Sequence, residues 1–298
     1  MSGLWEVIKQ TFVEWQEDNV PRLGAALAFY SVFSLAPGLI ITLALAGAIW
    51  GPDAAQGKLA AELETLIGSD VAAYLQDLAD HIHRSQGGVF AALISGVLLF
   101  FGATGAVVGL KDALNTVWGV VDTSHGVWWS LLRDRLLSVA LVLATGLLLL
   151  ASVVLTSFLQ GMSERAALQF PISFPTAVII NWVVSFTVIS LLFALIFTIL
   201  PDVELGWRDV LVGSAVTSVL FLIGRELIAF YLGRFSFTST YGTAGSLVAV
   251  LLWVYYSAQI LLLGAEFTQV YARRYGFPIK LPPGVRSIDE VAEHRNQS

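Results

Sequence analysis

The sequence contains no cysteine and few charged residues. The absence of cysteine among its 298 residues excludes disulfides, iron–sulfur clusters and thiolate zinc sites. Charged residues make up only 13% of the chain, whereas 56% of it is hydrophobic, far more than in an ordinary soluble domain. The formal net charge of -6 argues against a nucleic-acid partner, which would favour a basic face. This composition is typical of a polytopic membrane protein.

Motifs for catalysis and metal binding are also missing. The sequence has no HExxH, GxSxG, P-loop or GxGxxG pattern in a fitting context. Its four histidines are His81, His83, His125 and His294, and the first two point to different faces of a regular helix. We therefore expect no catalytic residues, no metal, no cofactor and no enzymatic activity.

Long apolar runs dominate what is present. A bilayer core about 30 Å thick is spanned by about 20 apolar helical residues. The sequence predicts an all-α fold with six transmembrane helices, at residues 24–50, 89–110, 136–159, 176–200, 209–232 and 246–271. Together they form a six-helix transmembrane domain over residues 24–275.

The distribution of Lys and Arg predicts the orientation of these helices. Six spans put both termini on one side, and that side holds Lys9, Arg22, Lys111, Arg133, Arg135, Arg208, Arg273, Arg274, Lys280, Arg286 and Arg295. The opposite side holds only Lys58, Arg84, Arg165 and Arg234. Because positive loops stay in the cytoplasm, we expect both termini to be cytoplasmic.

Three segments flank the spans. Residues 1–23 carry a helical apolar stripe and are predicted to form an interfacial helix along the inner leaflet. Residues 53–86 are predicted to form two amphipathic helices on the outer side, either a cap packed on the bundle or a mobile gate. Residues 276–298 are expected to be a flexible cytoplasmic tail.

Arg225 and Glu226 interrupt the fifth span. Side chains that are adjacent on a helix point about 100° apart, so we expect each to seek a partner on another helix. One interpretation is a cavity-lining pair that binds a charged headgroup or relays an ion, because intramembrane charges are costly and tend to be functional. The alternatives are snorkelling or a structural pair, and a misplaced span boundary.

The last span carries a second polar stripe. Tyr255, Gln259 and Glu266 share one helical face and are candidate cavity or ligand-binding residues. Glu266 lies close to the inner boundary, and the alternative for it is an interfacial acid paired with Arg22 or Arg273.

In the first span, Tyr30, Ser34 and Pro37 align as further candidates. Pro37 removes a backbone hydrogen bond and should kink the helix. Broken helices line binding sites in transporters, but a lone proline is also common in membrane helices.

The second span ends in small and then polar residues. Gly105 and Gly109 have GxxxG spacing and predict close packing against a neighbouring helix. Lys111, Asp112 and Asn115 follow at the inner end, where we expect a solvated helix end.

Four stretches of the sequence carry a family resemblance. They are DNVPRLGAALAFYSVFSLAP (18–37), FFGATGAVVGLKDALNTVWGV (100–120), LPDVELGWRDVLVGSA (200–215) and YGTAGSLVAVLLWVYYSAQILLLGAEFTQVYARR (241–274). Over residues 5–275 the chain resembles the YihY/virulence factor BrkB family of bacterial inner-membrane proteins. The resemblance implies six spans, cytoplasmic termini and an inner-membrane location. The family has also carried the label ribonuclease BN, a misattribution, and is linked to serum resistance, envelope integrity and export of lipid-like molecules.

Two functional hypotheses follow. The first is a transporter or lipid-handling protein that supports the cell envelope and whose partners are membrane lipids or an amphiphilic substrate. The alternative is a structural or assembly protein without transport activity. A homo-oligomer is compatible with either, since a GxxxG face serves contacts within one chain or between chains.

Overall fold

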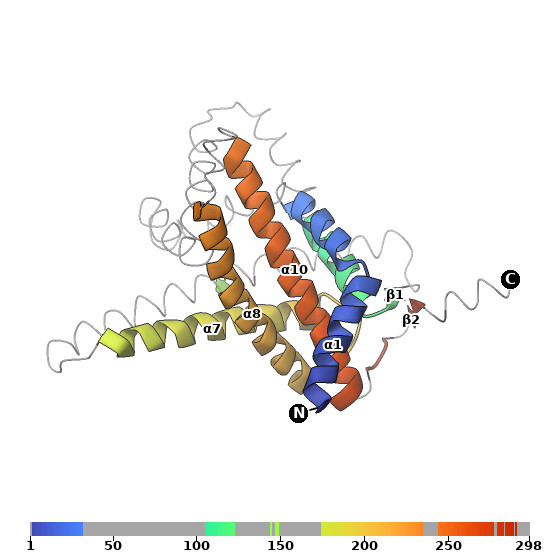
Figure 1. Ribbon diagram of the computed structural model, residues 1–298. Helices are drawn as coiled ribbons and strands as arrows, with labels where there is room; N and C mark the ends of the chain where they lie inside the picture. Colours follow the sequence, from blue (N-terminus) through green and yellow to red (C-terminus); the bar gives the residue numbers. More distant parts are fainter. Residues whose placement is uncertain are drawn as a thin grey trace.

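Long helices make up most of the described chain. The computed structural model describes residues 2–31, 105–122, 144, 147–148, 174–234, 244–276, 279–282, 284–288 and 290. Its helices are α1 (Ser2–Glu17), α7 (Phe174–Ile199), α8 (Trp207–Arg234) and α10 (Ala244–Tyr275), with further helical stretches at 20–31 and 105–117 (Figure 1). Two short strands, β1 (Val120–Asp122) and β2 (Val285–Ser287), complete the described elements.

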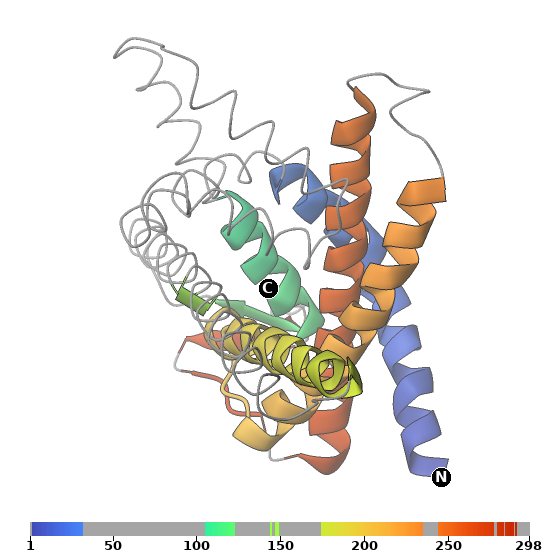
Figure 2. The same cartoon turned by 90° about the vertical axis from the view of Figure 1, so that its left-hand side faces the viewer.

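Within the part of the chain that the structure describes, three helices are long and apolar enough to cross a membrane. Their candidate spans are Trp182–Ile199, Trp207–Ile228 and Val248–Tyr275, which coincide with the fourth, fifth and sixth predicted spans. Most of the other three predicted spans, and all of residues 53–86, lie outside the described residues. Figure 2 views α7 almost along its axis while α10 runs up the picture, so α7 crosses the α8–α10 pair instead of running alongside it.

A reciprocal contact between glycine and threonine joins α8 to α10. A Cβ atom built on Gly264 would overlap Thr217, and one built on Gly213 would overlap Thr268. Each threonine hydroxyl donates to the glycine carbonyl four residues earlier in its own helix, at 2.7 Å for Thr217 and 2.6 Å for Thr268. The threonine side chains are thus fixed against the facing glycines. Only glycine allows the two antiparallel helices this close an approach.

The first helix ends at a turn centred on Asn19. This residue has a φ of 52°, a left-handed conformation that asparagine adopts more readily than most residues. Its side-chain amide donates to the Glu17 carbonyl at 3.1 Å, and its own carbonyl accepts from the Leu23 amide at 3.3 Å. The next helical stretch therefore starts at once in a new direction.

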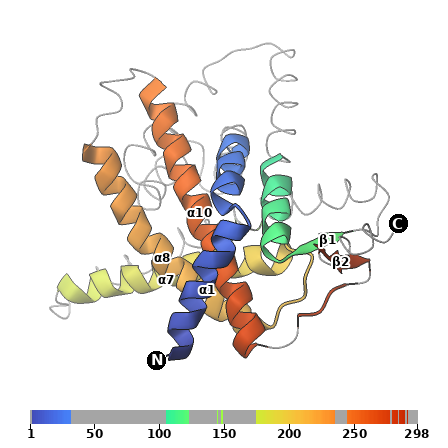
Figure 3. The same ribbon diagram turned by 45° about the vertical axis from the view of Figure 1, so that its right-hand side comes forward.

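The buried face of α1 packs on the C-terminal part of α10. Figure 3 shows α1 alongside the C-terminal part of α10. Val7 is fully buried and belongs to a cluster that includes Phe267 and Val270. Another side of α1 exposes an apolar stripe of Leu4, Trp5, Ile8 and Phe12. The placement of this helix at the inner leaflet stays a prediction.

The main core lies where five helical segments meet. Val20, Leu114, Phe197 and Leu262 are almost completely buried there, one from each of four helices, and Leu222 of α8 belongs to the same cluster. The helices 20–31 and 105–117 are therefore packed into the same unit as α7, α8 and α10.

The C-terminal segment returns to this unit. β2 pairs antiparallel with β1, with Val121 opposite Arg286, and the Ile288 amide donates to the Gly119 carbonyl at 2.9 Å. Lys280 and Glu204 form an isolated antiparallel β-bridge, in which the backbone amide of Glu204 donates to the Lys280 carbonyl at 3.0 Å. Lys280 and residues 285–288, within the segment expected to be a flexible tail, thus make backbone contacts with the rest of the described chain, and the expected all-α fold includes this two-stranded sheet.

Candidate functional site

Arg225 and Glu226 lie side by side on α8 and pair with each other. Arg225 Nη2 is 2.8 Å from Glu226 Oε1, and Arg225 Nε donates to the same oxygen at 3.2 Å. The expectation that adjacent side chains would not partner each other is wrong. Both side chains are long enough for their ends to meet although their Cβ atoms point in different directions.

The pair is unequally exposed. The Arg225 side chain is 15% exposed, whereas that of Glu226 is 62% exposed. Ile223 and Phe230 are also exposed and share the helical face of Glu226, since they lie three and four residues from it, and the next residue, Leu227, is exposed as well. A carboxylate therefore stands within an exposed apolar face of a candidate span.

Tyr255 and Gln259 face a different neighbour. The Gln259 amide donates to the Val20 carbonyl at 3.3 Å, and a Cβ atom on Gly24 would overlap that amide and lie 3.7 Å from Tyr255 Cε2. The helix face that meets α8 near Gly224 is instead formed by Tyr256 and Ile260. Tyr255 and Gln259 thus lie on a different face of α10 from the one that meets α8 near Gly224.

Tyr30 contributes to helix packing. Its ring lies 3.5 Å from a Cβ built on Gly105 and 3.3 Å from one built on Gly109. This contact confirms close packing at the two glycines. Ser34 and Pro37, the other two candidates of the first span, lie outside the described residues.

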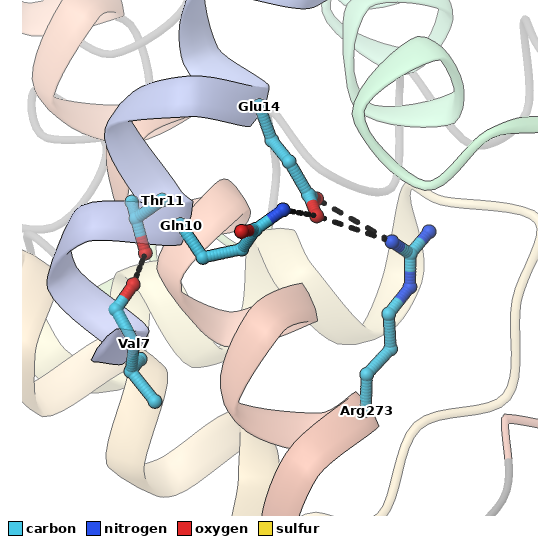
Figure 4. A network of polar contacts seen from close by, with 5 residues as sticks. All are labelled: Val7, Gln10, Thr11, Glu14 and Arg273. Atoms are coloured by element: carbon cyan, nitrogen blue, oxygen red, sulfur yellow. Dashed lines mark hydrogen bonds and ion pairs between the residues drawn. The ribbon is translucent and has the colours of Figure 1, made fainter. Parts of the chain in front are cut away.

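Glu266 is the most deeply buried of the candidates. It is 0% exposed, and among the described residues neither of its carboxyl oxygens has a hydrogen-bond partner. Arg273, one of its two expected partners, instead binds both carboxyl oxygens of Glu14 at 3.4 Å (Figure 4). The side-chain amide of Gln10 donates to Oε1 of the same carboxylate at 3.1 Å. Arg22, the other expected partner, is exposed, so the expected interfacial pairing of Glu266 is not formed.

The neighbour of Glu266 is a second acid, Asp18, placed by the turn at the end of α1. Burial raises the pKa of the Asp18 carboxyl above its ordinary value of 3.8, while the neighbouring Glu266 side chain, as a possible hydrogen-bond partner, lowers it. Glu14 and Glu17 raise this pKa further, and Arg273 lowers it. Two carboxylates cannot donate to each other, so the contact becomes a hydrogen bond only when one of them carries a proton.

A buried ion pair joins the helical stretch at 105–117 to the segment after α7. Lys111 Nζ lies 3.0 Å from Asp202 Oδ2, and the two side chains are 9% and 2% exposed. Asn115 donates to the same carboxylate and accepts from the Asp202 amide, both at 2.9 Å. The expectation of a solvated helix end is wrong for Lys111, although Asp112 is exposed. The spacing of four residues places Lys111 and Asn115 on one face of a helix, and this was the sequence signal for a shared partner such as Asp202.

The described residues hold no group of three or more His, Asp or Glu side chains that could bind a metal ion. All four histidines of the sequence lie outside the described residues.

Comparison with known proteins places the chain in a family. The model of the virulence factor BrkB family matches residues 11–288. The UPF0761 membrane protein RSc1559 of Ralstonia nicotianae is 27% identical over 88% of this chain, which covers 59% of that protein. A UPF0761 membrane protein of Cronobacter sakazakii is 26% identical, and the match covers 88% of this chain and 86% of the Cronobacter protein.

A third relative bears the name of an enzyme class. It is YfkH of Bacillus subtilis, which is named a ribonuclease-like protein. It is 23% identical, and the match covers 92% of this chain and 98% of YfkH. No solved structure matches the chain. The family match covers most of the sequence and agrees with the apolar helices described above. The chain therefore belongs to the virulence factor BrkB family of bacterial membrane proteins.

Proposed function

We propose that this protein binds an amphiphile in the bacterial inner membrane and moves it between leaflets, with both termini in the cytoplasm. The observation that carries the proposal is the Arg225–Glu226 pair on the exposed apolar face of α8. No residue is assigned a catalytic role.

The chemistry of this face fits an amphiphile. Arg225 binds Glu226 through Oε1. Because a charged carboxylate facing lipid is costly, the exposed Glu226 gains from a further donor at its second oxygen. Ile223, Leu227 and Phe230 would contact an acyl chain, while the carboxylate would bind a cationic headgroup. Because the exposed member of the pair is the acid, zwitterionic lipids with an amine in the headgroup are the favoured ligands.

Contacts at the other end of α8 support the proposed orientation. Arg274 at the end of α10 pairs with Glu6 of α1, and a Cβ on Gly276 would touch Asp209 at the start of α8. Segments assigned to the cytoplasm by their positive charge therefore gather at one end of the structure (Figure 3). Arg234, assigned to the outer side, ends α8 at the opposite end.

Native mass spectrometry in lipid nanodiscs tests the proposal. The variant Arg225→Ala with Glu226→Ala removes both charges at once, so that neither is left unpaired. Leu211→Ala is the matched control, because Leu211 is also exposed on α8 but lies two helical turns or more from the pair. We expect an amine-containing lipid retained by the wild type and by Leu211→Ala and lost from the double variant. Equal, nonselective lipid in all three would contradict the proposal and favour the structural or assembly role.

A further inference from the structure

Half-buried Asp18 lies between two contacts that join the N-terminal segment to α10, Val20 with Gln259 and Glu14 with Arg273, and its carboxyl group neighbours that of Glu266. Glu266 is completely buried, and neither oxygen has a donor among the described residues. A buried ionised carboxylate without a donor is strongly unfavourable. The two acids together satisfy each other as soon as they share a proton.

The surroundings favour the uptake of one proton. The charged groups that act on the Asp18 carboxyl, besides Glu266, are Glu14 and Glu17 of α1 and Arg273 of α10. Arg273 is bound to Glu14, so its charge is largely compensated before it reaches the pair. Lys111, the cation of the helical stretch at 105–117, is bound to Asp202. The local balance around the two acids is therefore negative.

We propose that Asp18 and Glu266 form a proton-binding site that holds one proton between the two carboxyl groups at neutral pH. The site lies between the N-terminal segment and α10, near the end of the structure assigned to the cytoplasm. No function is assigned to either residue by the family match.

A proton fits this site better than a metal ion. Cations such as sodium or calcium require several converging oxygen ligands. The described residues show no group of three or more acidic or histidine side chains in such an arrangement. A single proton needs only one oxygen from each of the two neighbouring carboxyl groups.

Loss of the proton would act on the N-terminal segment. Contacts on both sides of the pair hold this segment against α10, namely Gln259 to the Val20 carbonyl and Glu14 to Arg273. Two adjacent carboxylates would repel each other across that same boundary. Proton binding thus controls how tightly the N-terminal segment packs against α10. Where the proposed transport holds, it also couples this packing to the movement of the amphiphile.

Infrared spectroscopy of the purified full-length protein tests the site. The detergent must contain no ester or carboxyl group, so that the carbonyl-stretching band of a protonated carboxylic acid is visible. The variants are Glu266→Gln and Asp18→Asn, each of which replaces the shared proton by an amide donor of the same shape. Glu226→Gln is the control, since it removes a carboxylate that is exposed and ion-paired. Thermal unfolding of each variant checks that the fold is retained.

We expect the band in the wild type at neutral pH, its retention in Glu226→Gln and its loss from both Glu266→Gln and Asp18→Asn. The absence of the band from the wild type, or its survival in either site variant, would overturn the proposal. So would loss of the wild-type band when sodium replaces potassium at constant pH, which would identify a cation site. The spectrum is recorded without any lipid gradient. A retained band in a protein that moves no lipid would therefore refute the proposed transport and leave the proton site intact.

Discussion

Replacing Gly264 by alanine should force α8 and α10 apart. The new Cβ would lie 2.7 Å from Thr217 Cγ2 and 2.8 Å from Thr217 Cβ, well inside van der Waals contact. Thr217 cannot easily yield, because it is fully buried and its hydroxyl donates to the Gly213 carbonyl at 2.7 Å. Overpacking costs about 1–3 kcal/mol, and alanine recovers about 1 kcal/mol of helix propensity over glycine. We expect a net loss of up to about 2 kcal/mol in the free energy of unfolding.

The assay is unfolding by sodium dodecyl sulfate in mixed micelles, followed by helical circular dichroism. A second variant, Thr217→Gly with Gly264→Ala, removes every Thr217 atom that the new Cβ would strike and moves the glycine from α10 to α8. This double variant should regain at least half of the lost stability, because contacting residues couple energetically. Val219→Ile adds a methyl group on the exposed side of α8 and should change little. An unfolding midpoint of Gly264→Ala equal to that of Val219→Ile would refute the close contact.

Three further predictions follow from the polar contacts. Lys111→Met should cost about 3–5 kcal/mol by leaving the Asp202 carboxylate buried without its cation, and adding Asp202→Leu should restore much of that loss; equal losses in the single and double variants would contradict the buried pair. Asn19→Gly should leave the unfolding midpoint nearly unchanged, whereas Asn19→Val should cost about 1–2 kcal/mol at a φ of 52°, and equal midpoints would exclude the left-handed turn. Because burial raises the pKa of Asp18 above 3.8, its ionisation disfavours the folded state: wild-type stability should fall as the pH rises from 3.8 through the folded-state pKa. Asp18→Asn should remove that part of the pH dependence of the unfolding midpoint, and an unchanged profile would contradict a raised pKa.

Hydrophobic length predicted three of the spans well. The predicted runs at 176–200, 209–232 and 246–271 agree within a few residues with α7, α8 and α10 because the length of a membrane helix is set by bilayer thickness. Composition carries no information on how such helices cross, so the direction of α7 across the other two was not foreseen.

The polar contacts were harder to predict because they depend on distant partners. Lys111 and Asp202 are joined only in the folded state, and the sequence suggested a solvated end for the first. Asp18 looked like an ordinary residue before the first span, yet the turn at Asn19 brings it to Glu266. The pairing of Arg225 with Glu226 was missed for a local reason, since the helix angle alone ignores the reach of long side chains.

The close approach of glycines was foreseeable where they recur at helical spacing. Gly105 and Gly109 pack as that spacing predicts. The reciprocal arrangement of Gly213 and Gly264 with two threonines depends on the register between α8 and α10, which no single stretch of sequence contains.

The most direct test of the proposed function is lipid movement in proteoliposomes. A phospholipid with an amine headgroup and a fluorescent acyl chain is placed in both leaflets, and a membrane-impermeant reductant is added outside. Wild-type protein and Leu211→Ala should make inner-leaflet label accessible faster than protein-free vesicles do, and Arg225→Ala with Glu226→Ala should abolish that gain. Wild-type vesicles that lose fluorescence no faster than protein-free ones, or a double variant as active as the wild type, would contradict a role of the α8 pair in moving amphiphiles.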